Sequence, residues 1–233
     1  MQGFDLSAIL VNPEFGRMLL HGLRMTLVVA AGSWCLAMGL GVVLLVIRLT
    51  PSRIADRAVA AYVSYHRNVP TLVQLMLWYF GIASLLPDPV QTFLTDHSGE
   101  AVFAVIGLGL CQAAYFSEDL RSGLRSVAPG QAEAARALGH GYVGAMRHVL
   151  MPQALRNALP ALVNHSVSLF KNSSLAMAIG VAELTHAVRE VENQSFRTFE
   201  AYLIATLAYL LCSLAITAAG AVLQRRAALA GAR

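Results

Sequence analysis

The chain has 233 residues, of which 57% are hydrophobic and only 13% are charged. Soluble domains carry about 25% charged residues, so this composition excludes an ordinary soluble domain. The formal net charge of +4 is too small to indicate a nucleic-acid-binding protein. The charged residues are also clustered, which leaves long uncharged stretches between them.

Five of these stretches are long enough to cross a lipid bilayer. A spanning helix needs about 20 mostly apolar residues, and lipid cannot satisfy free backbone N–H and C=O groups, so each span is expected to be helical. We therefore expect one all-α polytopic membrane domain over residues 1–233, with five transmembrane helices. The expected spans are residues 22–47, 59–86, 101–118, 157–181 and 201–224.

Several segments along the chain have features of their own. Residues 1 to about 20 have an apolar side and are expected to lie on the outer surface. The second span is interrupted at Pro70, because proline removes a hydrogen bond and kinks a helix. The third span is rich in small residues, which let helices approach closely in lipid, so it is expected inside the bundle. Residues 183–200 are expected to form an outer loop.

The basic residues predict the orientation in the membrane. Cytoplasmic loops collect Lys and Arg, and most basic residues of this chain lie on the inner side if the N-terminus is outside. This predicts a periplasmic N-terminus and a cytoplasmic C-terminus. It also places a long polar loop, residues 119–156, in the cytoplasm.

The 119–156 loop has the pattern of two short helices separated by a glycine. Pro129 suits the first turn of a helix, residues 131–138 are good helix formers, and Gly139 is a natural C-terminal cap. A second helix is expected from about Tyr142 to Val149. An ordinary amphipathic loop is the alternative interpretation.

Small residues on the first of these helices leave room for another protein. Ala134 and Ala135 have almost no side chain, so a partner could approach that face closely. The neighbouring Glu133 could pair with Arg136 three residues later or with a basic residue of a partner.

The whole loop resembles the EAA---G---------I-LP loop of binding-protein-dependent ABC importer permeases, with Val and Met in place of the Ile and Leu. The resemblance covers residues 20–225 approximately. It implies a type I ABC importer permease fold with a cytoplasmic coupling-helix loop that binds a separate ATPase. The coupling residues that it implies are Glu133, Ala134, Ala135, Gly139, Val149, Met151 and Pro152.

Two further segments narrow the resemblance. Residues 66–82 (HRNVPTLVQLMLWYFGI) and 169–184 (LFKNSSLAMAIGVAEL) are similar to the polar amino-acid branch of these permeases, most of all to glutamate/aspartate permeases. The branch implies two ATPase subunits, a second permease subunit that is identical or homologous, a periplasmic solute-binding protein, and the bacterial inner membrane. ATP and Mg²⁺ are expected on the ATPase. The chain has no G-x-x-x-x-G-K-[ST] loop, so no catalytic residue, metal or cofactor is expected in it.

Polar side chains within the spans are candidates for contact with substrate, because an ionisable group in lipid is costly and usually functional. They form one group beside Pro70 and one in the fourth span. The candidate substrate-binding residues are Arg67, Asn68, Gln74, Lys171, Asn172, Ser173 and Ser174. Two alternatives remain: Arg67 reaches lipid phosphate at the inner surface, or Lys171 pairs with Glu118 or Glu183 inside the bundle.

The charges of these candidates favour an acidic substrate. Relatives in the branch that carry basic amino acids tend to have Asp after the lysine, whereas this chain has Asn172. Arg67 and Lys171 have no acidic residue beside them in the sequence, which favours glutamate or aspartate. Glutamine, an opine or another polar amino acid is the first alternative. A self-contained secondary carrier or channel is less favoured, because the spans contain almost no acidic residues for an ion relay.

Overall fold

Every regular element of the computed structural model, which describes residues 4–96 and 99–231, is a helix. The elements in chain order are α1 (Ser7–Leu10), α2 (Pro13–Arg48), α3 (Arg53–Asn68), α4 (Thr71–Met76), η1 (Leu77–Ile82), η2 (Ala83–Leu85), α5 (Asp88–Asp96), α6 (Gly99–Arg125), α7 (Pro129–Ala137), α8 (Tyr142–Ala145), η3 (Met146–Leu150), α9 (Met151–Asn172), η4 (Ser173–Ile179), α10 (Leu184–Ser195) and α11 (Thr198–Gly231).

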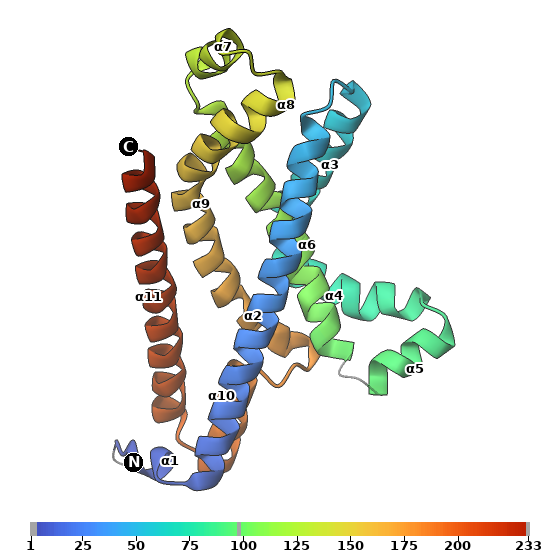
Figure 1. The fold of residues 1–233 in the computed structure, drawn as a ribbon. Coiled ribbons are helices and arrows are strands. Elements are labelled where there is room, and N and C mark those ends of the chain that lie inside the picture. Colours follow the sequence, from blue (N-terminus) through green and yellow to red (C-terminus); the bar gives the residue numbers. More distant parts are fainter. Residues whose placement is uncertain (1–3, 97–98, 232–233) are drawn as a thin grey trace.

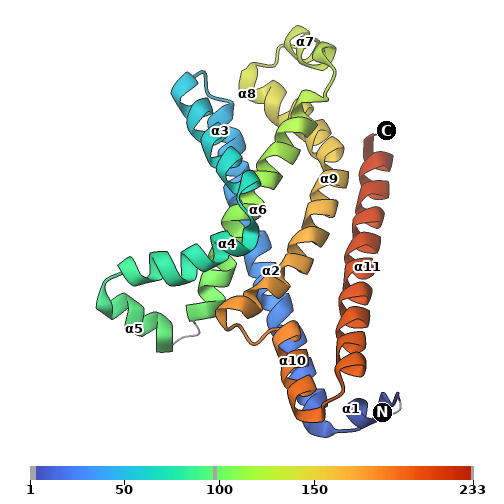
Figure 2. The ribbon, with the colours of Figure 1, turned by 180° about the vertical axis from the view of Figure 1, so that it is seen from behind.

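The long helices α2, α6, α9 and α11 form an elongated bundle (Figure 1). The short helices α7 and α8 lie at one end of it, whereas α1 and α10 lie at the other. The arm formed by α4 and α5 projects sideways from the middle of the bundle, and the view from behind shows the same arrangement (Figure 2). The polar loop between α6 and α9 therefore lies at the opposite end from the first described residues.

Length and composition identify three helices that could cross a membrane, among the residues that the structure describes. They are Pro13–Arg48, Gly99–Arg125 and Thr198–Ala228. The segments Arg53–Asn68 and Thr71–Leu85 qualify together as a fourth, with a bend of 107° between them. The predicted interruption at Pro70 is therefore confirmed.

The fourth expected span, residues 157–181, corresponds to α9 and η4. With 22 residues α9 is long enough to cross lipid. Polar side chains along it, such as Asn164 and His165, lower its mean hydropathy, so it is not among the helices identified as possible membrane spans by length and composition. That this fourth segment crosses the membrane therefore stays a prediction.

The fourth predicted span differs from the structure at its C-terminal end. The α-helix ends at Asn172, and a 3₁₀ helix follows up to Ile179. The hydroxyls of Ser173 and Ser174 donate to carbonyls three residues earlier, at 2.7 Å in both cases. Bonds of this kind compete with the α-helical pattern and favour the tighter turn.

The segment predicted as an outer loop, residues 183–200, contains a helix instead. The carboxylate of Glu183 accepts the backbone N–H groups of Thr185 and His186, both at 2.9 Å, and so caps the N-terminus of α10. One face of α10 is buried against α2 and α11. An acidic cap followed by an apolar stripe explains why the chain folds there.

Helix α6 lies inside the bundle, as its small residues predict. In its most apolar window 61% of the residues are buried, against 11% for α11. A side chain on Gly109 would place its Cβ 2.7 Å from Leu36 of α2, and one on Gly123 would overlap the backbone of Ala154 of α9. The glycines of α6 therefore allow two neighbouring helices to pack against it.

Candidate functional site

The helix α7 ends in a Schellman motif at Gly139. The N–H of Gly139 donates to the carbonyl of Arg136, and the N–H of His140 donates to the carbonyl of Ala135, both at 3.0 Å. Gly139 has φ +84°, in the left-handed region that favours glycine. The predicted glycine cap is confirmed, and it directs the chain from α7 back toward α8.

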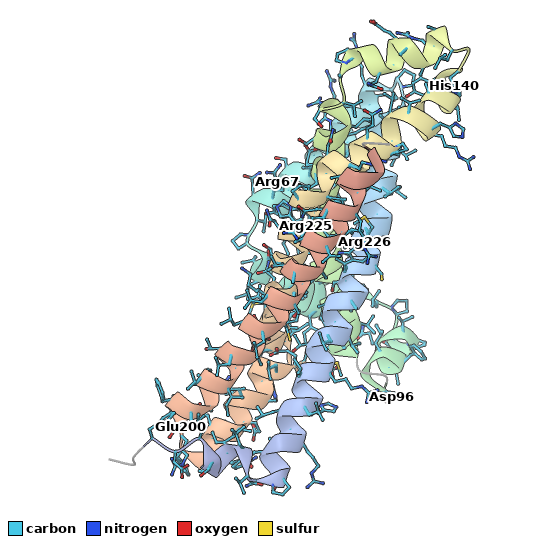
Figure 3. All side chains as sticks on the ribbon, turned by 60° about the vertical axis from the view of Figure 1, so that its left-hand side comes forward. Arg67, Asp96, His140, Glu200, Arg225 and Arg226 are labelled. Atoms are coloured by element: carbon cyan, nitrogen blue, oxygen red, sulfur yellow. The ribbon has the colours of Figure 1, made fainter. Side chains whose placement is uncertain are left out.

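Exposed apolar side chains surround this turn. Leu138, Tyr142 and Val143 are 82%, 67% and 73% exposed. They lie at the end of the bundle that His140 marks, far from Glu200 at the opposite end (Figure 3). Apolar side chains exposed together in this way mark an interaction surface.

The face of α7 that was expected to be open is only partly so. Ala134 is exposed, but Ala135 is 2% exposed and packs inward. Glu133 is exposed and forms no ion pair with Arg136 or with any other charged group in the described ranges. Glu133 was expected to pair either with Arg136 or with a basic residue of another protein, and only the second possibility remains.

Two side-chain hydrogen bonds connect the loop and the end of α6 to the start of α9. The Gln153 side chain donates to the Gln131 side chain at 3.1 Å, and Asn157 donates to Ser126 at 2.8 Å. Val149 and Met151 are half-buried, and Pro152 is exposed in the first turn of α9. A force applied to α7 can therefore pass directly to α9.

A buried glutamine closes the break between α3 and α4. The carboxamide of Gln74 contacts Nδ1 of His66 at 2.5 Å and donates to the carbonyls of His66 and Val69 at 3.1 and 2.7 Å. Its side chain is 1% exposed. Gln74 was expected to contact substrate, but in this structure its polar atoms are bonded within the chain beside Pro70.

A polar cavity of about 230 Å³ lies between α4, α6 and α9. It is lined by Thr71, Leu108, Cys111, Gln112, Tyr115, His165, Ser168, Leu169 and Asn172. Among the expected substrate-binding residues, Asn172 alone belongs to this lining. The cavity brings together helices that are far apart in sequence, in the middle of the expected membrane-spanning region.

The basic candidates lie at the edge of this cavity or outside it. The guanidinium of Arg67 lies 5.5 Å from the centroid of the Tyr115 ring, and Tyr115 lines the cavity. Lys171 is exposed in the last turn of α9, and Asn68 is exposed and donates to the carbonyl of Ser64 at 2.7 Å.

The two serines after Asn172 have local roles. Ser173 is fully buried, and its hydroxyl donates to the carbonyl of Phe170. Ser174 is half-buried and donates to the carbonyl of Lys171. Both were expected to contact substrate, and both contribute to the end of α9.

Three carboxylates of the bundle, those of Asp119, Glu118 and Glu183, have partners other than Lys171. Asp119 Oδ2 lies 2.6 Å from Nδ1 of His165. Glu118 binds Arg48 and also lies 3.6 Å from Arg121. Glu183 accepts from Tyr209 at 2.8 Å and caps α10. The alternative in which Lys171 pairs with Glu118 or Glu183 is therefore wrong.

Several polar residues of the cavity were missed in the sequence, four of them on α6 and α9. Gln112 and Tyr115 are three residues apart on α6, and His165 and Ser168 are three residues apart on α9. Side chains with this spacing share one helix face. Polar residues repeating at three to four residues within otherwise apolar spans were the signal that could have found them.

No cluster of three or more His, Cys, Asp or Glu side chains suited to a metal occurs in the part of the chain that the structure describes.

The family model for "Binding-protein-dependent transport system inner membrane component" matches residues 36–229. The chain belongs to this family. Proteins of this family are membrane permease subunits of ABC transporters, in which separate ATPase subunits hydrolyse ATP.

Known relatives match almost the whole chain. The probable amino-acid ABC transporter permease protein PatM of Vibrio harveyi is 36% identical over 207 residues, which cover 89% of each chain. The glutamate/aspartate import permease protein GltJ of Escherichia coli (strain K12) is 30% identical, over 90% of this chain and 87% of the relative.

A solved structure supports the predicted fold. The crystal structure of an amino acid ABC transporter with histidines contains a chain that is 28% identical, with a TM-score of 0.83. The match covers 97% of this chain and 100% of that chain. The predicted type I importer permease fold is confirmed.

Proposed function

We propose that this chain is the permease subunit of an ATP-driven importer of polar amino acids, with the α4–α6–α9 cavity on the substrate path. The observation that carries this proposal is a polar cavity between helices of the expected membrane-spanning region, since polar groups within a membrane are costly and mark the paths of solutes. The relatives named for amino-acid transport support the substrate class.

We further propose acidic amino acids as the preferred substrates. The Arg67 guanidinium lies beside the cavity, and a guanidinium binds a carboxylate through two parallel hydrogen bonds. Lys171 forms no ion pair with a described residue. The carboxylates of Asp119 and Glu118 are engaged by His165 and Arg48, so neither is free to bind a cationic substrate group.

A second candidate is a neutral polar amino acid such as glutamine. It is favoured by the lining itself, whose polar members are amides, hydroxyls, a thiol and the paired His165. Arg67 and Lys171 both lie outside this lining. An amide side chain would find donors and acceptors on both sides of the cavity.

We propose that the helices of the 129–150 segment couple this cavity to ATP hydrolysis. In the proposed arrangement two permease subunits stand on two ATPases, with the N-terminus periplasmic and the C-terminus cytoplasmic. ATP binding closes the ATPases and draws the two loops together. The loop is bonded to α9, and α9 lines the cavity, so the movement would open the cavity toward a periplasmic binding protein.

Uptake of labelled glutamate, glutamine and arginine by the Asn172→Asp variant tests the substrate proposal. A new negative charge in the cavity should lower glutamate uptake about tenfold and raise arginine uptake. The control is Asn164→Asp, which adds the same charge to an exposed position of α9 outside the lining. Unchanged preferences in Asn172→Asp would refute the acidic assignment. Absence of amino-acid uptake by the wild-type complex would refute the proposed function as a whole.

A further inference from the structure

Gln112 on α6 is a buried side chain without a hydrogen-bond partner. It is 5% exposed, its Nε2 is enclosed and unpaired, and its carboxamide bonds to nothing in the described ranges. Gln74 provides the comparison, because its equally buried carboxamide contacts one ring nitrogen and two carbonyls. The chain therefore satisfies one buried glutamine completely and leaves the other free.

A free carboxamide in this position needs an explanation. Burial removes water from the amide, and this costs free energy unless another group replaces the lost hydrogen bonds. Gln112 lines the cavity of about 230 Å³. A water molecule takes up about 30 Å³ in the liquid, so the cavity has room for a solute that could supply the missing partner.

The groups around Gln112 define the chemistry of that solute. Ser168 and Asn172 of α9 line the same cavity and offer further hydrogen bonds, whereas Leu108 and Leu169 provide apolar surface. This combination suits a short apolar stem that ends in a polar group. Both neighbouring carboxylates are engaged, Asp119 with His165 and Glu118 with Arg48, so neither accepts from the Gln112 amide.

We propose that Gln112 is a specificity-determining residue of this cavity, and that its carboxamide rotates toward the cavity so that the amide donates to the terminal carboxylate or carboxamide oxygen of the transported amino acid. This inference rests on the proposed function, because it assigns one contact within the same cavity. Replacing the donor by a carboxylate should disfavour glutamate and favour a cationic side chain such as that of arginine.

Equilibrium binding to the purified complex of the permease with its ATPase tests this inference. The binding protein is left out, so that its own selectivity does not contribute. The probes are labelled glutamate, glutamine and arginine. Gln112→Met keeps the length of the side chain and removes both polar atoms. It should weaken binding of glutamate or glutamine, whichever the wild-type complex binds more tightly, about tenfold. Gln112→Glu, which is close to isosteric, should weaken glutamate binding further and strengthen arginine binding.

The matched control is Ser33→Ala. Ser33 is also fully buried and its hydroxyl is unpaired, but it lies on α2 outside the cavity lining. Its removal should leave all three affinities within about twofold of wild type. If one Gln112 variant fails to assemble with the ATPase, the binding affinities of the other variant decide whether the inference holds.

Two results would overturn the inference in distinguishable ways. If the wild-type complex binds glutamate or glutamine and the Gln112 variants bind it equally well, water alone satisfies the amide and the inference is wrong, whereas the proposed function stands. If the wild-type complex binds none of the three amino acids, the inference and the proposed function both fail.

Discussion

Replacing Gly139 by alanine is the most specific test of the loop geometry. The residue has φ +84°, and an L-residue in this region costs about 1–2 kcal/mol relative to its preferred conformations. A Cβ at this position would meet no heavy atom within 4 Å, so the effect is confined to the backbone. A penalty of this size lowers the population of the native turn roughly fivefold to thirtyfold relative to competing loop conformations.

Gly141→Ala is the matched control for this experiment. Gly141 lies two residues later, its added Cβ would also meet no atom within 4 Å, and its φ of −67° suits any residue. The assay measures the affinity of the permease for its ATPase, and the amino acid transported per ATP hydrolysed in proteoliposomes.

We expect Gly139→Ala to lower both quantities about fivefold or more, and Gly141→Ala to change them less than twofold. The unfolding temperature of the membrane helices should stay unchanged in both variants, because the turn lies at one end of the bundle. Full coupling in Gly139→Ala would refute the reasoning that this turn presents the docking surface.

Two further substitutions separate docking from stability. Glu133→Lys should abolish transport while membrane insertion stays intact, because Glu133 is exposed and unpaired in the described part of the chain and is free for a partner. Comparison of insertion and uptake in the same cells checks this, and normal uptake would contradict the docking role. Gln74→Leu should destabilise the chain by about 1–3 kcal/mol, because it leaves the Val69 carbonyl without its donor and the His66 carbonyl with only the Cys111 thiol. Thermal unfolding in detergent measures this effect, and an unchanged unfolding temperature would show that the amide does not hold the α3–α4 bend.

Features that depend on local backbone chemistry could be predicted from the sequence. Pro70 predicted the break that the structure shows as a 107° bend. Pro129 and Gly139 predicted where α7 begins and where its chain turns. In each case one residue type restricts its own φ angle or lacks a hydrogen-bond donor, so neighbouring helices are not needed for the prediction.

Features that depend on helix packing were less predictable. Gln112 and Ser168 meet at the cavity only because α6 packs against α9, and nothing local in either helix indicates that contact. Ala135 was expected to be open, but the way in which the loop folds buries it. Gln74 was expected to contact substrate, and its own chain binds it at the bend. The side-chain direction of each residue follows from the tertiary arrangement.

The most direct test of the whole account is the accessibility of a cysteine at Ala134, an exposed position on α7. The three native cysteines, Cys35, Cys111 and Cys212, are first replaced by serine or alanine. The account predicts that a membrane-impermeant thiol reagent labels Ala134→Cys only from the cytoplasmic side, and that a short cross-linker joins this cysteine to the ATPase. Labelling from the periplasmic side, or transport by the purified chain without an ATPase, would contradict it.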